Sequence, residues 1–550
     1  MKPTVKPASQ FATNTTTVPT AENQILEANP NSPAGEVKPT SKSLASQAVS
    51  GLKWGSASTV ANAVMQIGYT TIMARLLAPE AFGVIAIAGV ILRFGSYFAS
   101  LGLSQAIIQK EDLSNENIRA AFTSSLVLGA FFTIVAWLIA PFATEFFDNG
   151  AGVNESLLVP VVQVMGIAFL LNGLSSTATT LLQRNMQFKA LSIIETISYV
   201  LAYLGVGIIC AYLGLGVWSL VFASLAQTTL VAIGAYMVVR HNVLLHFNWT
   251  SYKPLFSYGS KMSIVSFLEF ISISLGSILI GRAFGSYKLG IYDRALLLVS
   301  LPMHMLTRTV SKVIFPSFSK MQSDNEKLGR VYLSSITLLA AAVIPVCLGI
   351  AVASPEIILV LLGDQWVESI PVLQVLCLGI PLSFITMFAG IVCDAKAALN
   401  SKVVLNVLFI LVICGCFYLL KDYGLVGFAF AVFIAELLRV ALYQRVMRKV
   451  LDLSYKTQLQ IYLPGLLNGV LVAACIYGVS HILRSLDIPM IVVLAAQIVT
   501  GALSLLTLTF VFPLKLLREQ IGQVIAMVGF NVNTSTYLGK MISRFKKDFI

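Results

Sequence analysis

IGYTTIMARLLAPEAFGVIAIAGVIL, which spans Ile67–Leu92, has a counterpart in the second half of the chain, SLGSILIGRAFGSYKLGIYDRALLLV, which spans Ser274–Val299. Arg75 of the first stretch and Arg282 of the second occupy equivalent positions, 207 residues apart. Each stretch reads as an apolar helix, a short turn beside the arginine, and a second apolar helix. Because internal repeats of this kind usually build membrane transporters whose binding site lies between the two halves, the repeat predicts that architecture here.

The composition is that of an integral membrane protein. The 550 residues are 57% hydrophobic and 11% charged, with a mean hydropathy of +0.83, whereas soluble domains carry about 25% charged residues. The net charge of +12 is better explained by cytoplasmic loops facing anionic lipid than by a nucleic-acid surface, so no nucleic-acid partner is expected. The seven cysteines lie in apolar segments without CxxC pairs, which predicts small core residues and neither disulfides nor a metal site.

The expected fold class is all-α, because fourteen apolar runs approach the roughly 20 residues that a membrane helix needs. They lie at about 51–76, 81–106, 119–141, 157–182, 190–212, 215–239, 256–282, 288–316, 330–353, 368–393, 402–420, 424–447, 460–483 and 489–512. Between the ninth and tenth runs, SPEIILVLLGDQW from Ser354 predicts a short interfacial helix.

The basic residues determine the expected orientation. If the N-terminus is cytoplasmic and the spans alternate, most of the 37 basic residues fall on the cytoplasmic side, and Arg93 and Arg294 fall inside spans. The outer side then holds Arg75, Arg282, Lys288, Lys421 and Arg484. This distribution satisfies the positive-inside rule, so both termini are predicted to be cytoplasmic.

The chain divides into five predicted segments. Residues 1–45 are rich in Thr, Ser, Pro and Asn, lack the apolar core of a signal peptide, and are expected to form a disordered cytoplasmic tail. Residues 46–240 and 241–450 form two lobes of six spans each, in parallel because six is even. Two further spans occupy 451–513. Residues 514–550 combine apolar residues at helical spacing with a basic end, which predicts an amphipathic cytoplasmic tail.

Several sequence segments resemble those of a known protein family. The opening Leu44–Ile87, the segments LLQRNMQFKALSIIE (Leu181–Glu195) and GLGVWSLV (Gly214–Val221), and the stretch Phe256–Pro316 resemble the Wzx-like polysaccharide transporters of the multidrug/oligosaccharidyl-lipid/polysaccharide exporter superfamily. The likeness is greatest to colanic-acid-type and teichuronic-acid-type exporters and extends to about Met447. The long N-terminal tail departs from the family pattern.

That resemblance implies a V-shaped pair of helix bundles in the bacterial inner membrane that works by alternating access. The implied function is the flipping of an undecaprenyl-pyrophosphate-linked oligosaccharide from the cytoplasmic to the periplasmic leaflet, for the synthesis of a surface polysaccharide. The implied partners are this lipid-linked substrate, membrane lipids, and a polysaccharide polymerase with its export machinery.

Two arginines inside spans are candidates for substrate binding, because intramembrane charges are costly and usually functional. Arg93 lies midway along the second span, about 18 Å from either end at 1.5 Å per residue, and is expected to bind the diphosphate. A buried ion pair across the bundle is the alternative for Arg93. Arg294, in the eighth span, is the second candidate, and its neighbour Asp293 is expected to point elsewhere on the helix.

Glu269, in the middle of the seventh span, is the candidate for coupling transport to protons. It could instead pair with Arg93, or remain protonated and hydrogen-bonded to Ser266 and Ser272, which share its helix face. Asp394 is expected to be a simple interface charge near a cytoplasmic helix end, together with Lys396.

A polar stripe on the first span, formed by Asn62, Gln66 and Tyr69, suits sugar hydroxyls in the central cavity, although helix–helix packing would explain it equally well. The repeat itself predicts structural or gating turns. The residues expected in that role are Arg75, Arg282, Gly83 and Gly290.

No enzyme activity, metal or cofactor is expected. The chain lacks the GxxxxGK[ST] sequence of ATP hydrolysis and a large outer loop that could carry catalytic residues. Two alternatives remain: a cation-coupled drug or metabolite antiporter of the same superfamily, and a membrane polysaccharide polymerase. A cavity dominated by carboxylates would favour the antiporter, and an extended outer loop would favour the polymerase.

Overall fold

The computed structural model describes residues 41–99, 107–108, 113–147, 155–245, 249–320, 324–396 and 398–520. Its contacts divide the chain into two units, Met1–Gln47 and Ala48–Ile550, and the second unit contains both repeats. The first helix begins at Ser41, inside the segment predicted to be a disordered tail. Residues 1–40 and 521–550 lie outside the described residues, so the predictions for the two tails stay predictions there.

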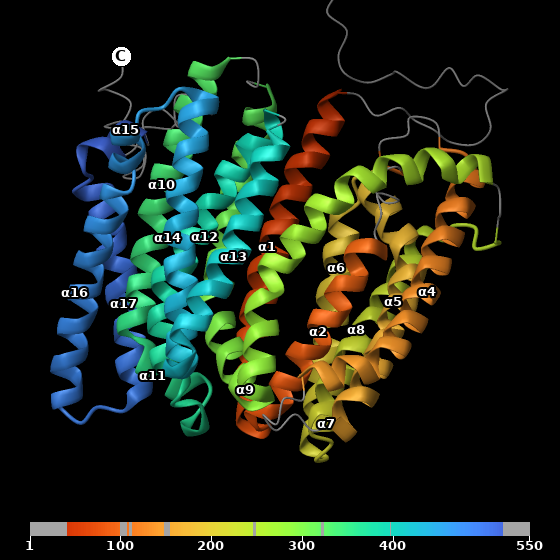
Figure 1. Cartoon of the computed structure of the whole chain (residues 1–550), viewed down its shortest axis with the longest axis horizontal. Coiled ribbons are helices and arrows are strands. Elements are labelled where there is room, and N and C mark those ends of the chain that lie inside the picture. Colours follow the sequence, from red (N-terminus) through yellow and green to blue (C-terminus); the bar gives the residue numbers. More distant parts are fainter. Residues whose placement is uncertain are drawn as a thin grey trace, which may run out of the picture. The chain divides into compact units, whose positions relative to one another are not determined.

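Long helices account for nearly all of the described chain and run alongside one another (Figure 1). The N-terminal half comprises α1 (Ser41–Leu76), α2 (Pro79–Ala99), α4 (Asn115–Phe147), α5 (Glu155–Arg184), α6 (Phe188–Tyr199), the π-helix η1 (Val200–Gly207), α7 (Ile208–Tyr212) and α8 (Val217–Val239). The C-terminal half comprises α9 (Trp249–Lys320), α10 (Asn325–Val352), α11 (Ser354–Leu361), η2 (Asp364–Trp366), α12 (Ser369–Ala395), α13 (Leu399–Leu420), η3 (Lys421–Tyr423) and α14 (Gly424–Leu451). It is followed by α15 (Tyr455–Gln460), α16 (Leu463–Ser485), α17 (Met490–Leu506) and the π-helix η4 (Thr507–Val511).

Within the described residues, 11 helices are long and apolar enough to cross a membrane. Two of these stretches contain a break: Phe267–Leu306 at Gly285, and Asn400–Leu451 at the 3-10 turn Lys421–Tyr423. The chain is therefore a multi-pass all-α membrane protein, as the composition predicted. The count of fourteen spans stays a prediction. The short helix predicted from Ser354 is confirmed as α11.

The two halves pack in the same way. In the first half α5 packs against both α4 and α8, and in the second half α12 packs against both α10 and α14. The first repeated stretch forms the α1–α2 hairpin, whereas the second remains within α9 and breaks at a single residue, Gly285, whose φ of 77° lies in the left-handed region. Helices α2 and α9 form the contact between the halves. Near the C-terminus, α16 packs against both α10 and α17.

Apolar side chains fill the interior and also cover much of the outside. One continuous core includes Met73 and Ile87 of the first half and Ile280 and Leu289 of the second. Large apolar side chains such as that of Phe142, which is 70% exposed, also point outward from the bundle. An apolar outer surface is stable in contact with lipid tails. The helices also satisfy their backbone hydrogen bonds internally, as a membrane interior requires.

Candidate functional site

Arg93 places an exposed positive charge in the C-terminal part of α2, six residues before Ala99. Fourteen residues separate it from Pro79, where the helix begins, which corresponds to about 21 Å along the axis. Its guanidinium lies back over the preceding turn, where a Cβ added to Gly89 would be 3.8 Å from Nη1. Among the residues that the structure describes, no side chain pairs with Arg93, so the alternative of a buried ion pair receives no support.

Arg93 lies beside the contact between the two halves. The next residue, Phe94, packs edge-on against Phe270 and Phe267 of α9, with ring centroids 5.6 and 6.1 Å apart respectively. Arg93 therefore lies next in sequence to a residue at the contact between α2 and α9.

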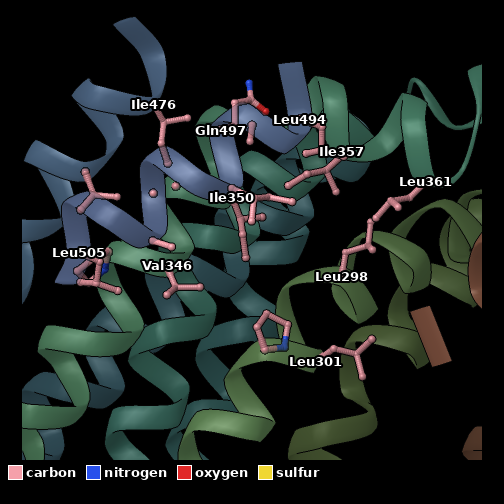
Figure 2. Close-up of a pocket in the computed structure, with 18 of the residues that line it drawn as sticks. Leu298, Leu301, Val346, Ile350, Ile357, Leu361, Ile476, Leu494, Gln497 and Leu505 are labelled. Carbon is pink, nitrogen blue, oxygen red and sulfur yellow. The ribbon is translucent and has the colours of Figure 1, made fainter. Parts of the chain in front are cut away.

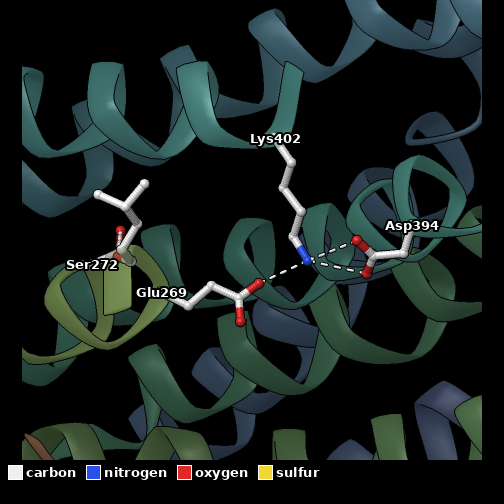
Figure 3. Close-up of polar contacts among 5 residues, drawn as sticks. Glu269, Ser272, Asp394 and Lys402 are labelled. Carbon is white, nitrogen blue, oxygen red and sulfur yellow. Dashed lines mark hydrogen bonds and ion pairs between the residues drawn. The ribbon is translucent and has the colours of Figure 1, made fainter. Parts of the chain in front are cut away.

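Glu269 of α9 is held in a three-residue ion cluster (Figure 3). The Nζ atom of Lys402 lies 2.7 Å from one Glu269 oxygen and 3.0 Å from an oxygen of Asp394. The Lys402 side chain is 14% exposed, and those of Glu269 and Asp394 are 37% and 45% exposed. Figure 3 shows the lysine amine between the two carboxylates, so one positive charge faces two negative charges.

This cluster differs from both expected surroundings of Glu269. Ser272 donates its hydroxyl hydrogen bond to the backbone oxygen of Leu268 rather than to the carboxylate, and the side chain of Ser266 lies outside the described residues. Asp394 is not a simple interface charge, and Lys396 donates to Asn325 instead.

Sequence reasoning did not single out Lys402, because a lysine in the first turn of α13 resembles any positively charged helix end. Its partners come from α12 and from α9, more than 130 residues earlier in the chain. The one available indication was the proximity of Asp394 and Lys402 on either side of a short turn.

The structure contradicts the expectation that Asp293 points away from Arg294, and the role of Arg294 in substrate binding stays a prediction. Its guanidinium pairs with the adjacent Asp293 at 2.6 Å and lies over the ring of Phe82, 4.5 Å from the centroid. Neighbouring helix residues point about 100° apart, but the long arginine side chain bends far enough to reach the short aspartate. Arg294 is thus neutralised where Arg93 is not, and this favours Arg93 as the anion-binding residue.

The polar stripe of α1 faces its own half. Asn62 donates to Ser58 at 3.3 Å, and Ser58 shares a 3.2 Å hydrogen bond with Thr196 of α6. Tyr69 is 6% exposed and packs edge-on against Tyr203 of η1, with centroids 4.9 Å apart. These contacts correspond to the helix-packing alternative.

Gln66, the third member of the stripe, is half-buried. A sugar-binding role for Asn62, Gln66 or Tyr69 stays a prediction.

The four residues that mark the repeat lie at the end of the bundle expected to face outward. Arg75 donates to the backbone oxygen of Val360 at 2.7 Å. Arg282 donates to the backbone oxygen of Phe146 and lies over its ring. Gly83 and Gly290 lie inside helices rather than in turns, about one turn after each break.

A large apolar pocket of about 570 Å³ lies between α9, α10, α11, α16 and α17 (Figure 2). Leu298, Ile350, Ile357 and Leu505 are among its lining residues. Its polar lining residue, Gln497, donates its amide to Ser480 at 2.7 Å. The pocket therefore offers hydrocarbon surface and fits a lipid chain better than a polar solute.

Comparison with known proteins adds relatives to this geometry. The family described as "Polysaccharide biosynthesis protein" matches residues 72–371. The lipopolysaccharide biosynthesis protein WzxC of Escherichia coli (strain K12) is 26% identical over 442 residues, which are 78% of this chain and 86% of WzxC. The succinoglycan biosynthesis transport protein ExoT of Rhizobium meliloti (strain 1021) is 28% identical over 312 residues, which are 56% of this chain and 61% of ExoT.

Solved structures share the fold. The lipid II flippase MurJ in its inward closed conformation superposes with a TM-score of 0.63 at 15% identity, covering 83% of this chain and 98% of MurJ. An inward-facing multidrug transporter of the MATE family superposes with a TM-score of 0.56 at 16% identity, covering 72% of this chain and 96% of the transporter. Since the family match includes more than half of the residues, the chain belongs to the polysaccharide biosynthesis protein family.

Proposed function

We propose that this protein moves a lipid-linked oligosaccharide across the bacterial inner membrane, from the cytoplasmic to the periplasmic leaflet, by alternating access. The observation that carries the proposal is Arg93, a membrane-embedded cation that lies beside the contact between the halves and has no partner among the described residues. An anionic diphosphate would supply the missing charge. The family membership and the names of WzxC and ExoT support a role in polysaccharide export.

The same proposal places the hydrocarbon chain of the substrate in the apolar pocket. A diphosphate at Arg93 must remain joined to a hydrocarbon chain that stays out of water, and the pocket of Figure 2 offers apolar surface for it. Ile67 of α1 lines this pocket directly after Gln66 of the polar stripe. In this proposal Arg93 holds the head of the substrate and the pocket holds its tail.

Orientation is part of the proposal. The distribution of basic residues supports cytoplasmic termini, so the end that carries Arg75 and Arg282 would face the periplasm. A polysaccharide polymerase and its export machinery would act on the flipped product.

Flipping of a fluorescent polyprenyl-diphosphate-linked sugar in proteoliposomes tests the role of Arg93. Arg93→Ala should weaken the apparent affinity for this substrate by about 10- to 100-fold, since a hydrogen bond to a charged group contributes about 1.5–3 kcal/mol. Arg93→Lys should recover part of the loss. Arg445→Ala, which removes another exposed arginine, is the matched control. Unchanged flipping by Arg93→Ala at equal protein levels would refute the diphosphate role, and a preference for cationic drugs would favour the antiporter.

Chain length tests the pocket. Ala502 lines it, and Ala502→Leu reduces its volume. This variant should raise KM for a long polyprenyl substrate and leave KM for a short-chain analogue unchanged. An equal effect on both substrates would indicate a general packing defect and remove the lipid-chain assignment.

A further inference from the structure

Two glycines allow the backbones of the halves to touch. A Cβ added to Gly83 of α2 would lie 1.8 Å from the backbone oxygen of Ser286 in α9. A Cβ added to Gly290 of α9 would lie 1.9 Å from the backbone oxygen of Pro79 in α2. Any other residue would overlap with a backbone carbonyl, which cannot move aside as a flexible side chain can.

The two contacts are related by the internal repeat. Gly83 and Gly290 are 207 residues apart, and so are Pro79 and Ser286, the residues whose carbonyls they receive. Each half therefore contributes one glycine and one carbonyl to a reciprocal contact, here called the glycine lock and defined by these four residues. Helix packing alone would not require a reciprocal contact between glycines and carbonyls, since many pairs of side chains can pack two helices together.

Hydrogen bonds surround the glycine lock and also cross between the halves. Gln365 and Trp366 of the second half both donate to the backbone oxygen of Ala74 in the first, at 2.5 and 2.9 Å. Trp366 is fully buried, and its ring packs edge-on against Phe82, next to Gly83. Arg75 and Arg282 each donate to a carbonyl of the opposite half. All of these contacts lie at the same end of the bundle, at or near the breaks of the two repeats.

We propose that the glycine lock and its surrounding hydrogen bonds form the closed outer gate of the transporter. The words "outer" and "gate" rest on the proposed function and orientation. Release to the outer side requires both carbonyls to separate from their glycines, and the acceptors that then lose their hydrogen bonds are uncharged backbone carbonyls. Such acceptors can exchange protein donors for water, which suits a contact that must open and close repeatedly.

Cysteine accessibility tests the gate without any substrate. The reporter is Arg93→Cys in a chain whose seven native cysteines are replaced, labelled in intact cells by a membrane-impermeant maleimide from outside. Gly83→Ala and Gly290→Ala should each raise the labelling rate severalfold, because the added methyl holds the lock apart. Gly68→Ala and Gly415→Ala are the matched controls, since their added Cβ atoms meet nothing within 4 Å, and they should label at the parental rate. Parental labelling of both folded lock variants would overturn the proposal.

A cross-link covers the case in which the lock variants do not fold. Ala74→Cys with Gln365→Cys, joined by a short reducible dithiol reagent, should stop export, and reduction should restore it. Lys288→Cys with Glu368→Cys joins two residues of the same half, whose side chains form an ion pair at 2.5 Å, and should leave export unchanged. Undiminished export by the cross-linked 74/365 pair would overturn the gate. Failure of the transport proposal would instead appear as absent flipping with intact gating in the labelling assay.

Discussion

Replacing Lys402 by methionine removes the cation that holds two carboxylates together, and the structure allows the cost to be worked out. At an effective dielectric constant of about 20, opposite charges about 3 Å apart attract by roughly 5 kcal/mol, and Lys402 has two such partners. Removing one partner of a buried pair costs about 3–5 kcal/mol, whereas exposed pairs contribute about 0–1 kcal/mol. Because Glu269 and Asp394 are 37% and 45% exposed, water can replace much of the lost interaction, and we expect Lys402→Met to lower the free energy of unfolding by about 1–2 kcal/mol.

The stability change caused by a second substitution, Glu269→Gln, should differ in sign between the wild type and the Lys402→Met background. In the wild type, Glu269→Gln removes one attractive contact and should destabilise the protein by about 0.5–1 kcal/mol. In the Lys402→Met background the two carboxylates face each other within about 6 Å without a cation, so the same Glu269→Gln relieves repulsion and should stabilise the protein by about 0.5–1 kcal/mol.

Equilibrium unfolding of the four variants in one lipid–detergent mixture gives the coupling energy as a double-mutant cycle. Lys396→Met is the control, because this lysine lies at the same end of α12 outside the cluster, and its loss should change stability by less than about 0.5 kcal/mol. If Glu269→Gln destabilises the Lys402→Met protein as much as it destabilises the wild type, the cluster does not couple these residues and the reasoning fails.

Three further predictions concern single contacts. Trp366→Phe should lower the free energy of unfolding by about 1–2 kcal/mol, since it removes a buried donor to Ala74 and some ring volume; a neutral result in the same unfolding assay would contradict it. Tyr69→Phe should be neutral or stabilising by up to about 1 kcal/mol, because the buried hydroxyl has no partner among the described residues, and a clear loss of stability would reveal one. Asp324 caps α10 by accepting a hydrogen bond from the Lys327 amide, and this bond together with the Lys327 side chain lowers the pKa of Asp324 below its ordinary 3.8. Its stabilisation should be present above pH 3.8 and be lost as the pH falls through the lower folded value, so the Tm difference between the wild type and Asp324→Asn should narrow as the pH falls below 3.8.

Features that depend on local sequence were predictable. The run SPEIILVLLGDQW predicted the short helix α11, and the second apolar run predicted a helix of membrane length that contains Arg93. Both depend on residues close in the chain, where helical rise and apolar length restrict the outcome strongly.

Features that depend on side-chain reach or on distant elements were not predictable. Asp293 was placed away from Arg294 by helix geometry, yet the arginine side chain bends to meet it. Lys402 joins α9, α12 and α13, and no periodicity in one helix reports which other helix faces it. The repeat identified Gly83 and Gly290 but predicted that they lie in turns, whereas both lie inside helices where two backbones approach closely. A turn and a close backbone approach both require glycine, so the sequence does not distinguish them.

The glycine lock also has the form of a contact between two identical chains. In a two-fold dimer one patch is used twice, so a single substitution acts at both of its sites. Here the two copies are covalently joined and their sequences have diverged, so Gly83 and Gly290 can be altered one at a time. The protein therefore retains the geometry of a symmetric dimer interface, while mutation can change the stability of each of its two glycine–carbonyl contacts separately.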